Sequence, residues 1–308
     1  MGILRARILA YVTNQGGNSV SVIDTRTNVE IARINVGTLP TGLAITPNQR
    51  RLYVSNTGDG TISIIDTLTN TEIFPRINLG TPPAGLAVTP DGTRLYVTNP
   101  ALNRVSVIDV NTNSVTGVTI PVGMNANSIV ISPDGTRAYV ANAGNNNVTV
   151  LNLTTNSVIT TIPVGNAPAV AAVNPSLPRV YVTNVGDDNI SVISTASNSV
   201  IGSPIPVGNA PIAAFFTSDG ARAYVTNSQD NNLSVINTAN NTEIPPRIPV
   251  GNLPFTLAFT PNGTRAYVVL QGENAVSIVN ILTNTELPGR IPVGVAPLSI
   301  IIVRVPNR

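Results

Sequence analysis

Arg94-Leu95-Tyr96-Val97-Thr98-Asn99 is a short run of alternating residues, and versions of it recur along the whole chain. Its tyrosine belongs to a series, spaced 42 or 43 residues apart, that contains every tyrosine present: Tyr11, Tyr53, Tyr96, Tyr139, Tyr181, Tyr224 and Tyr267. The glycine of a Val-Gly or Leu-Gly pair repeats with the same period: Gly37, Gly80, Gly123, Gly165, Gly208, Gly251 and Gly294. A unit of about 43 residues written seven times predicts a repeat architecture.

One repeat, from Ala84 to Gly123, divides into four short segments rich in β-branched and aromatic residues. We name these segments A, B, C and D, at residues 84–89, 94–99, 104–109 and 114–122. Turn-forming Asp-Gly, Asn and Pro residues separate them, which is typical of strands in antiparallel order. No segment shows a helical period long enough for a helix. Four such strands per repeat predict the blade of an all-β, seven-bladed β-propeller.

Charge and proline predict which strand is innermost. Strand A carries no charge in any repeat, so it should be covered on both sides and line the centre. Strand D carries charge and proline, which suit an exposed edge. The chain begins in a strand B, around 7–14, and ends in a strand A, at 298–303.

We therefore expect the C-terminal strand A to join the N-terminal strands B, C and D and close the ring. The expected organisation is a single domain of seven blades, at residues 41–80, 84–123, 127–165, 169–208, 212–251 and 255–294, and at 298–308 together with 1–37.

Composition excludes several kinds of chemistry. All 17 basic residues are arginine, and the chain has no Lys, His, Cys or Trp. It therefore lacks a side chain that titrates near neutral pH, a thiol nucleophile, a Schiff-base amine and the usual zinc or haem ligands. We expect no catalytic residue, no cofactor and no metal site.

Charge and hydropathy limit the partners. The net charge of +2 is too small to indicate nucleic-acid binding. The chain contains no stretch of about 18 apolar residues, so we expect no membrane span. The first residues show no apolar segment followed by a cleavage site, so either the protein stays where it is made or a leader has been removed.

The tetrapeptide at the B strands resembles that of a known family. Tyr-Val-Thr-Asn stands at 11–14, 96–99, 181–184 and 224–227, with Ser or Ala replacing Thr at 53–56 and 139–142, while Tyr267-Val268-Val269-Leu270 departs from it. With the flanking turns, the chain resembles the Y-V-T-N family of seven-bladed propellers. The resemblance implies an extracytoplasmic scaffold or binding protein, as in archaeal surface layers and exported bacterial proteins, and implies no shared catalytic residues.

Antiparallel order sorts the connections onto two faces of the disc. The A–B and C–D turns share what we call the bottom face, and the B–C and D–A loops share the top face. An arginine two residues before the tyrosine repeats on the bottom face: Arg51, Arg94, Arg137, Arg179, Arg222 and Arg265. This ring could grip phosphate or a polyanion. Pairing with aspartates of the same face is the interpretation that we favour.

The top face and the channel offer weaker candidates. Carboxylates such as Asp187 and Asp188 in the B–C loops could hold Ca²⁺, but Asn, Asp and Gly there are better explained as turn formers. A central channel walled by charge-free strands argues against a catalytic channel.

The outer rim differs between blades. Strand D carries a glutamate and an arginine in four consecutive blades, and the other three, from Val115 to Ile205, carry no charge. Neutral edges invite strand pairing, so this stretch is a candidate association edge. If so, association through this edge should be abolished when lysine replaces three residues: Val118, Thr160 and Ser203. Drift between repeats is the alternative explanation, and we favour it.

The leading functional hypothesis is a non-enzymatic scaffold or binding module of a cell-surface or secreted layer that acts through protein–protein association, including self-association. The first alternative is a binder of carbohydrate or peptide on the top face. The second is an enzyme of the lactonase-like propeller type.

Overall fold

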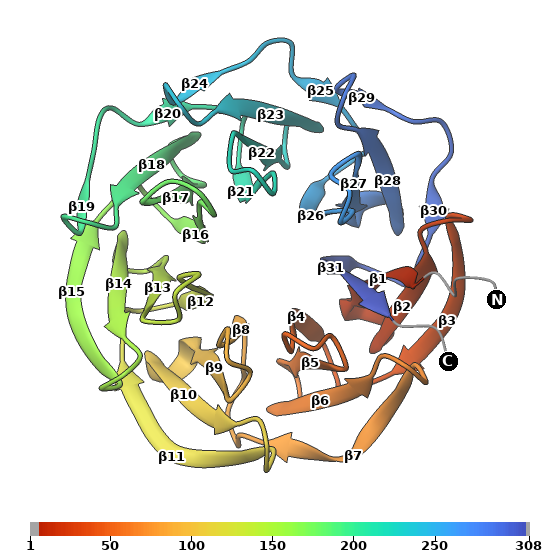
Figure 1. Ribbon diagram of the computed structural model, residues 1–308, viewed down its shortest axis with the longest axis vertical. Coiled ribbons are helices and arrows are strands. Elements are labelled where there is room, and N and C mark those ends of the chain that lie inside the picture. The colour runs from red at the N-terminus through yellow and green to blue at the C-terminus, as the bar shows by residue number, and fades with distance from the viewer. Residues whose placement is uncertain (1–5, 306–308) are drawn as a thin grey trace.

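Seven small sheets surround a central axis in the computed structural model, which describes residues 6–305 (Figure 1). The innermost strands are β4 (Pro40–Ile45), β8 (Leu86–Val88), β12 (Ala126–Ile131), β16 (Pro168–Val173), β21 (Pro211–Phe216), β26 (Pro254–Phe259) and β31 (Pro297–Val305). The second strands are β1 (Arg7–Asn14), β5 (Arg51–Asn56), β9 (Arg94–Asn99), β13 (Arg137–Asn142), β17 (Arg179–Asn184), β22 (Arg222–Asn227) and β27 (Arg265–Leu270). The third strands are β2 (Ser19–Asp24), β6 (Thr61–Asp66), β10 (Arg104–Asp109), β14 (Asn147–Asn152), β18 (Asn189–Ser194), β23 (Asn232–Asn237) and β28 (Ala275–Asn280).

The outermost strands come in two forms. Four are continuous: β3 (Val29–Asn35), β7 (Thr71–Asn78), β11 (Ser114–Pro121) and β15 (Ser157–Pro163). Three are broken into short pieces: β19 (Ser199–Val200) and β20 (Ile205–Pro206), β24 (Thr242–Glu243) and β25 (Ile248–Pro249), and β29 (Thr285–Glu286) and β30 (Ile291–Pro292). Three one-turn 3₁₀ helices lie in B–C loops: η1 (Gln15–Gly17), η2 (Pro100–Leu102) and η3 (Gln271–Glu273).

The chain ends close the ring as the sequence predicts. β31 pairs antiparallel with β1, in the register that places Leu9 opposite Val303 and Tyr11 opposite Ile301. The resulting sheet has the order β3-β2-β1-β31, so one blade takes three strands from the N-terminus and one from the C-terminus. We number it blade 1, and blades 2 to 7 follow from β4–β7 through β26–β30. The prediction of an all-β, seven-bladed propeller closed in this way is confirmed.

Four strands depart from the expected pattern: strand A of blade 3 and the broken D strands of blades 5, 6 and 7. Strand A of blade 3 was expected over 84–89, but β8 covers three residues, and the prolines Pro82 and Pro83 precede this segment. Strand D of blade 5 breaks between Val200 and Ile205, where Gly202 has a positive φ of 69°. The ends of the blade 3 segment still bond to strand B, because the Ala84 N–H donates to the Thr98 carbonyl and the Thr89 N–H donates to the Arg94 carbonyl. A left-handed glycine does not by itself break strand D, because Gly117 has a positive φ of 81° inside the continuous β11.

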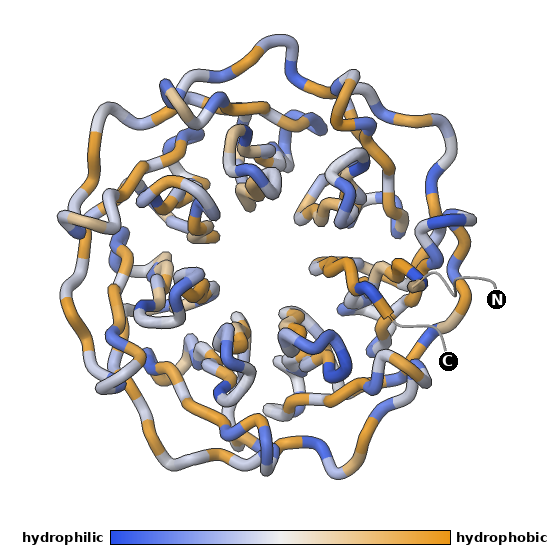
Figure 2. The backbone as a smooth tube through the Cα atoms, in the orientation of Figure 1, coloured by the Kyte–Doolittle hydropathy of each residue, from blue (hydrophilic) through white to orange (hydrophobic). Residues whose placement is uncertain are grey.

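The core lies between the blades. Each of seven apolar clusters combines one face of a blade with the facing side of the next, as Tyr139 and Val148 do with Val180 and Ile193. A cluster across the seam joins Val12 of blade 1 to blade 7. Hydrophobic and hydrophilic residues alternate along the outer strands in Figure 2. Because each blade is covered on both sides, the B and C strands bury nearly every residue.

Candidate functional site

The tyrosine of the repeated tetrapeptide fastens one blade to the next. All seven tyrosines are fully buried. Six of them donate a hydrogen bond to an asparagine Oδ1 in the C–D turn of the following blade: Tyr11 to Asn70 (2.6 Å), Tyr53 to Asn113 (2.8 Å), Tyr96 to Asn156 (2.7 Å), Tyr181 to Asn241 (2.5 Å), Tyr224 to Asn284 (2.7 Å) and Tyr267 to Asn28 (2.6 Å). The bond from Tyr267 crosses the seam, so the same contact recurs around the closed ring.

Tyr139 is the exception. Its hydroxyl is buried and has no partner among the described residues. The asparagine in the matching turn, Asn198, accepts from Nη1 of Arg137 at 3.3 Å, as Asn241 accepts from Arg179 at 3.2 Å. Burial raises the pKa of every tyrosine, and it raises that of Tyr181 to about 12.

The third residue of the tetrapeptide makes a second contact between blades. In four blades its hydroxyl donates to a carbonyl in the strand A segment of the next blade: Thr13 to Thr41 (3.0 Å), Ser55 to Ala84 (2.7 Å), Thr183 to Ile212 (2.8 Å) and Thr226 to Phe255 (2.8 Å). Thr98 instead donates to the Gly85 carbonyl of its own blade. Ala141 and Val269 lack this hydroxyl. In their blades a strand A side chain bridges to the neighbour: Ser128 accepts from the N–H of Ala171, and Thr256 donates to the carbonyl of Leu298.

The asparagine of the tetrapeptide joins strands B and C within a blade. Nδ2 of Asn227 donates to Asn232 Oδ1 at 2.7 Å and to Ser234 Oγ at 2.9 Å, and Asn14, Asn56, Asn142 and Asn184 make equivalent pairs of bonds. In blade 7 Leu270 takes the asparagine's place, and the buried Ser277 hydroxyl has no partner among the described residues. The tetrapeptide is therefore a structural device.

The six arginines of the predicted ring stand at the starts of their B strands, on the bottom face. Four of them reach a backbone carbonyl in the next blade's C–D turn: Arg51 to Val110 (3.0 Å), Arg94 to Leu153 (3.3 Å), Arg137 to Thr195 (2.6 Å) and Arg179 to Thr238 (2.7 Å). Among the described residues, none of the six forms an ion pair within 4.0 Å. The favoured prediction of direct Arg–Asp pairing is therefore wrong.

The aspartates of this face are occupied within their own turns. Hydrogen bonds from the Thr89 hydroxyl and the Thr93 N–H lower the pKa of Asp91, and Ser132 and Thr136 do the same for Asp134. Because hydrogen bonds within the turn already stabilise each of these carboxylates, an arginine partner is not required. Four of the six arginines donate to a carbonyl of the adjacent blade.

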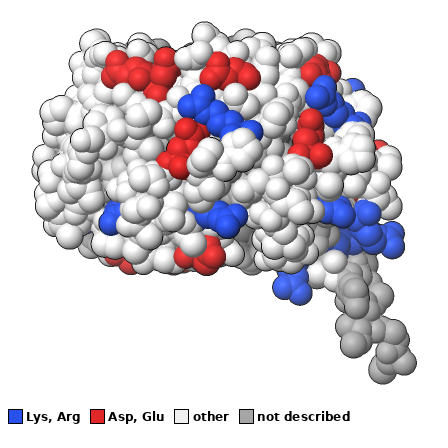
Figure 3. Space-filling view, turned by 90° about the horizontal axis from the view of Figure 1, so that it is seen from above, with Lys and Arg blue, Asp and Glu red and all other residues white. Residues whose placement is uncertain are grey.

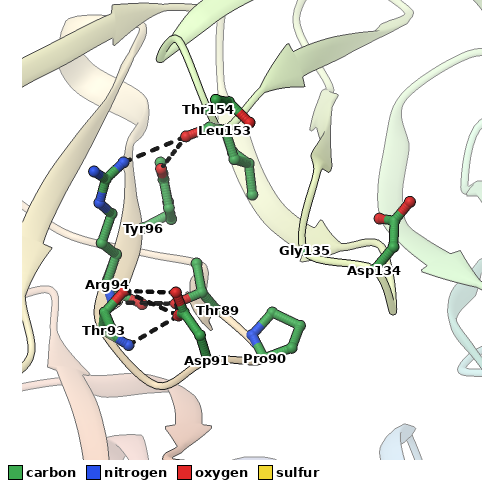
Figure 4. A pocket seen from close by; sticks show the side chains of 10 residues that line it. All are labelled: Thr89, Pro90, Asp91, Thr93, Arg94, Tyr96, Asp134, Gly135, Leu153 and Thr154. Carbon is green, nitrogen blue, oxygen red and sulfur yellow. Dashed lines mark hydrogen bonds between the residues drawn. The ribbon is translucent and has the colours of Figure 1, made fainter.

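Pockets lie between neighbouring blades on the bottom face. Figure 4 shows one of about 310 Å³, in which Arg94 and Tyr96 both point to the Leu153 carbonyl and Asp91 is bound by Thr89 and Thr93. Pockets of about 450 Å³ beside Arg51 and about 460 Å³ beside Arg137 also lie between neighbouring blades, where these arginines donate to the Val110 and Thr195 carbonyls. The bottom face therefore carries pockets that each expose part of an arginine, and whether they bind an anion stays a prediction.

The top-face carboxylates Asp187 and Asp188 accept hydrogen bonds from backbone N–H groups. Asp187 accepts from the N–H of Asn166 at 2.7 Å, and Asp188 accepts from the N–H of Ala210 at 2.8 Å. These bonds join the B–C loops to neighbouring D–A loops and do not close a local turn, and calcium binding stays untested. The described residues contain no cluster of three or more metal-ligating side chains.

The rim shows the contrast that the sequence predicts. Glutamate and arginine form ion pairs on four blades: Glu30–Arg33 (2.8 Å), Glu72–Arg76 (2.7 Å), Glu243–Arg247 (2.8 Å) and Glu286–Arg290 (3.5 Å). Val118 lies exposed on β11, and Thr160 is half-buried on β15. Ser203 lies in the break of strand D, outside any strand, so the structure does not place it beside the other two on a continuous edge.

The fold and these contacts define the class of the protein, a seven-bladed β-propeller. Within it, residues 68–200 match the family model described as "Lactonase, 7-bladed beta-propeller". No curated protein matches the chain. No helix among the described residues has the length and apolar character needed to cross a membrane.

Solved structures share the fold at low identity. The periplasmic gluconolactonase of Pseudomonas aeruginosa is 20% identical, with a TM-score of 0.77 over 97% of this chain and 100% of that one. A functionally unknown protein from Desulfotomaculum acetoxidans is 17% identical, with a TM-score of 0.84 over 96% and 99%. Hydrazine synthase of Kuenenia stuttgartiensis is 20% identical, with a TM-score of 0.78 over 88% and 91%. At these identities the likeness concerns the fold alone.

Proposed function

We propose that this protein is a non-enzymatic binding module that acts through protein–protein association, as part of a cell-surface or secreted layer. The observation that carries the proposal is the uncharged edge formed by β11 and β15, which we call the rim arc. Both strands are continuous, and nearly all their side chains are exposed or half-exposed. The extracytoplasmic setting rests on the resemblance to Y-V-T-N propellers.

The rim arc has the features of an edge that accepts another strand. Apolar side chains project from it, with Val115 at 41% exposure, Val118 at 37%, Val158 at 40% and Ile159 at 42%. An outermost strand leaves one row of backbone N–H and C=O groups unpaired, and uncharged β-branched side chains leave that row accessible. The ion-paired rims of blades 1, 2, 6 and 7 have the opposite character, since charged side chains discourage edge pairing.

The test is the mass in solution of a double variant, Val118→Lys with Thr160→Lys, measured by light scattering. A charged residue at the centre of each edge should reduce association to the monomer, and Val29→Lys on β3, at 54% exposure, is the matched control that should keep it. Ser203→Lys should have a smaller effect because Ser203 lies in the strand break. A wild-type monomer with no captured protein partner, or a double variant with unchanged mass, would exclude the rim arc.

A second candidate is lactone hydrolysis, which the match of residues 68–200 and the likeness to a gluconolactonase favour. The direct assay follows acid release from gluconolactone in a pH-stat. The binding-module proposal predicts that gluconolactone hydrolyses at the same rate with the protein as without it. Saturable acceleration that survives further purification would favour the enzyme instead.

Carbohydrate or peptide binding on the top face stays a separate prediction. Side chains of these loops already bind backbone groups, as Asn146 does with the N–H of Ala167. A glycan and peptide array tests it directly.

A further inference from the structure

The charged residues of the described chain are sorted by face. The rim is balanced, with four glutamates and four arginines in ion pairs. The top face has one arginine and five acids: Arg104, Asp59, Asp187, Asp188, Asp230 and Glu273. The bottom face has ten arginines and six aspartates: Arg7, Arg26, Arg50, Arg51, Arg94, Arg137, Arg179, Arg222, Arg265, Arg304, Asp24, Asp66, Asp91, Asp109, Asp134 and Asp219.

This sorting gives the top face a net charge of −4 and the bottom face a net charge of +4 within residues 6–305. Figure 3, a side view, shows acidic atoms along one edge of the disc and a mixed band below them. Arginines, with some acidic atoms, lie along the opposite edge. A disc with separated charges has an electrostatic dipole along its axis, and the potentials of its two faces are complementary to each other.

The charges on each face are accessible. Arg26, Arg50, Arg222 and Arg304 are exposed on the bottom face and form no ion pair among the described residues. On the top face Asp187 and Asp188 are likewise outside the ion pairs, whereas Asp59, Asp230 and Glu273 each contact a rim arginine. Both faces therefore keep charge that is not neutralised within the same molecule.

Neither set of charges follows every blade. Acidic residues stand in the B–C loops of blades 2, 5, 6 and 7, and the pockets beside Arg51, Arg94 and Arg137 lie between blades 2 and 3, 3 and 4, and 4 and 5. The two faces are therefore complementary in the sign of their charge.

We propose that the top face binds the bottom face of a second copy of this chain, so that discs stack along their common axis. The two surfaces in contact are different, so the interface is heterologous and each added copy presents a fresh face of either kind. Such a contact builds an open stack. It uses surfaces separate from the rim arc, and it stands whether or not the rim arc associates.

Salt dependence is the first test. At about 10 mM salt the screening length is about 30 Å, and at about 1 M it falls to about 3 Å. Light scattering should therefore show a mass that rises with protein concentration at low salt and falls at high salt to the mass that rim association alone gives, with apparent affinity changing about tenfold or more. A wild-type mass that is independent of salt would overturn the proposal.

Neutralising the top face provides the second test. The variant Asp59→Asn, Asp187→Asn, Asp188→Asn, Asp230→Asn removes the net charge while keeping an acceptor oxygen at each position. The chain already uses this replacement in blade 4, where Asn145 Oδ1 accepts from the Met124 N–H. This variant should fold with an unchanged far-ultraviolet circular dichroism spectrum and have the same mass at low salt as at high salt. Stacking at the wild-type level would count against the proposal.

Reversing the bottom face gives a test by mixing. The variant Arg26→Glu, Arg50→Glu, Arg222→Glu, Arg304→Glu changes that face from +4 to −4 by exposed substitutions alone. By itself it should have the same mass at low salt as at high salt. Added to wild type it should shorten the stacks, because its acidic top face still binds a wild-type bottom face while its own bottom face repels the next copy. A variant that stacks alone, or that leaves the wild-type mass unchanged, contradicts the proposal.

The rim variants separate this inference from the proposed function. Val118→Lys with Thr160→Lys should keep the salt-dependent stacking and lose association that persists at high salt. Loss of both kinds of association in the rim variants would assign the low-salt mass to the rim and overturn the stacking proposal.

Discussion

Tyr139 and Tyr181 are chemically the same residue in the same structural position, and they differ in one contact. Both are fully buried, but the Tyr181 hydroxyl donates to Asn241 whereas that of Tyr139 has no partner among the described residues. The arginine before each tyrosine contacts the turn asparagine in both blades, Arg137 with Asn198 and Arg179 with Asn241, so the difference lies in the tyrosine contact alone. At the residue scale, the tyrosine and the hydroxyl residue of the tetrapeptide mainly join blades, and its asparagine joins strands within a blade.

This difference predicts opposite responses to the loss of a hydroxyl. Tyr181→Phe should lower the free energy of unfolding by about 1 kcal/mol, since Asn241 loses a donor. Tyr139→Phe should leave stability unchanged or raise it slightly, because it removes a buried polar atom that has no partner. Chemical denaturation of both variants measures the difference, and an equal loss in the two would disprove the assigned contacts.

Sequence alone predicted the residue types on each face, but it did not predict their partners. The position of Arg94 two residues before Tyr96 places both near the bottom face, and the period of 43 repeats this placement. The spacing cannot distinguish an aspartate in the same blade from a carbonyl in the next, since both lie within reach of a long side chain. The turn asparagines that receive the tyrosines were missed for the same reason. In most repeats a Thr-Asn or Ser-Asn pair recurs with the same period as the tyrosine, and this pattern could have indicated them. The sequence of one repeat, however, does not show which residues of the next blade it contacts.

At the scale of the strand, the pairing of B with C depends on the last residue of B. Asn227 reaches Ser234 on β23 in blade 6. Leu270 cannot make this contact with Ser277 on β28 in blade 7. Two equivalent strand pairs therefore differ by a single buried polar contact.

The matched changes Ser234→Ala and Ser277→Ala test this element. Ser234→Ala should cost about 1–3 kcal/mol, because one N–H of the buried Asn227 amide loses its acceptor. Ser277→Ala should cost nothing or stabilise slightly, since its hydroxyl has no partner to lose. Thermal or urea unfolding of the two variants gives the comparison, and a larger loss for Ser277→Ala would be inconsistent with this packing.

The outer strands show how far prediction reached at this scale. Charge and proline predicted that strand D is outermost, and they predicted which blades have charged rims. They did not predict that strand D of blade 5 breaks at Ser203. Proline does not distinguish a broken outer strand from a continuous one, because Pro75 in blade 2 lies within the continuous β7. A proline at an edge is compatible with either outcome, and so is a left-handed glycine, because Gly117 lies within the continuous β11 while Gly202 lies at the break.

At the scale of the whole molecule, the missing residue types should shape its response to pH. With no His, Lys or Cys, side chains do not titrate between about pH 5.5 and pH 9, so stability should be nearly constant there. The tyrosines have pKa values raised by burial, that of Tyr181 to about 12. The native state therefore holds protons that the unfolded state releases above about pH 10.

Stability should accordingly be intact below about pH 10 and be lost as the pH rises toward 12. Tyrosine ionisation, followed by absorbance near 295 nm, should be cooperative and coincide with loss of the circular dichroism signal. On the acid side, hydrogen bonds lower the pKa of Asp91 and Asp187, so stability should fall as the pH drops below about 4. Ionisation of all seven tyrosines near pH 10 with the fold intact would be incompatible with their burial.

The closed ring is the claim on which the faces, the rim and the charge sorting all depend. Removing residues 295–308 deletes β31, exposes the inner edge of β1 and opens the cluster that joins blade 7 to blade 1. The thermal midpoint of the shortened chain should fall by at least about 10 °C. A synthetic peptide of residues 295–308 should restore most of the loss, while a scrambled peptide of the same composition should not. An unchanged midpoint after truncation, or a midpoint that neither peptide raises, would contradict closure by β31.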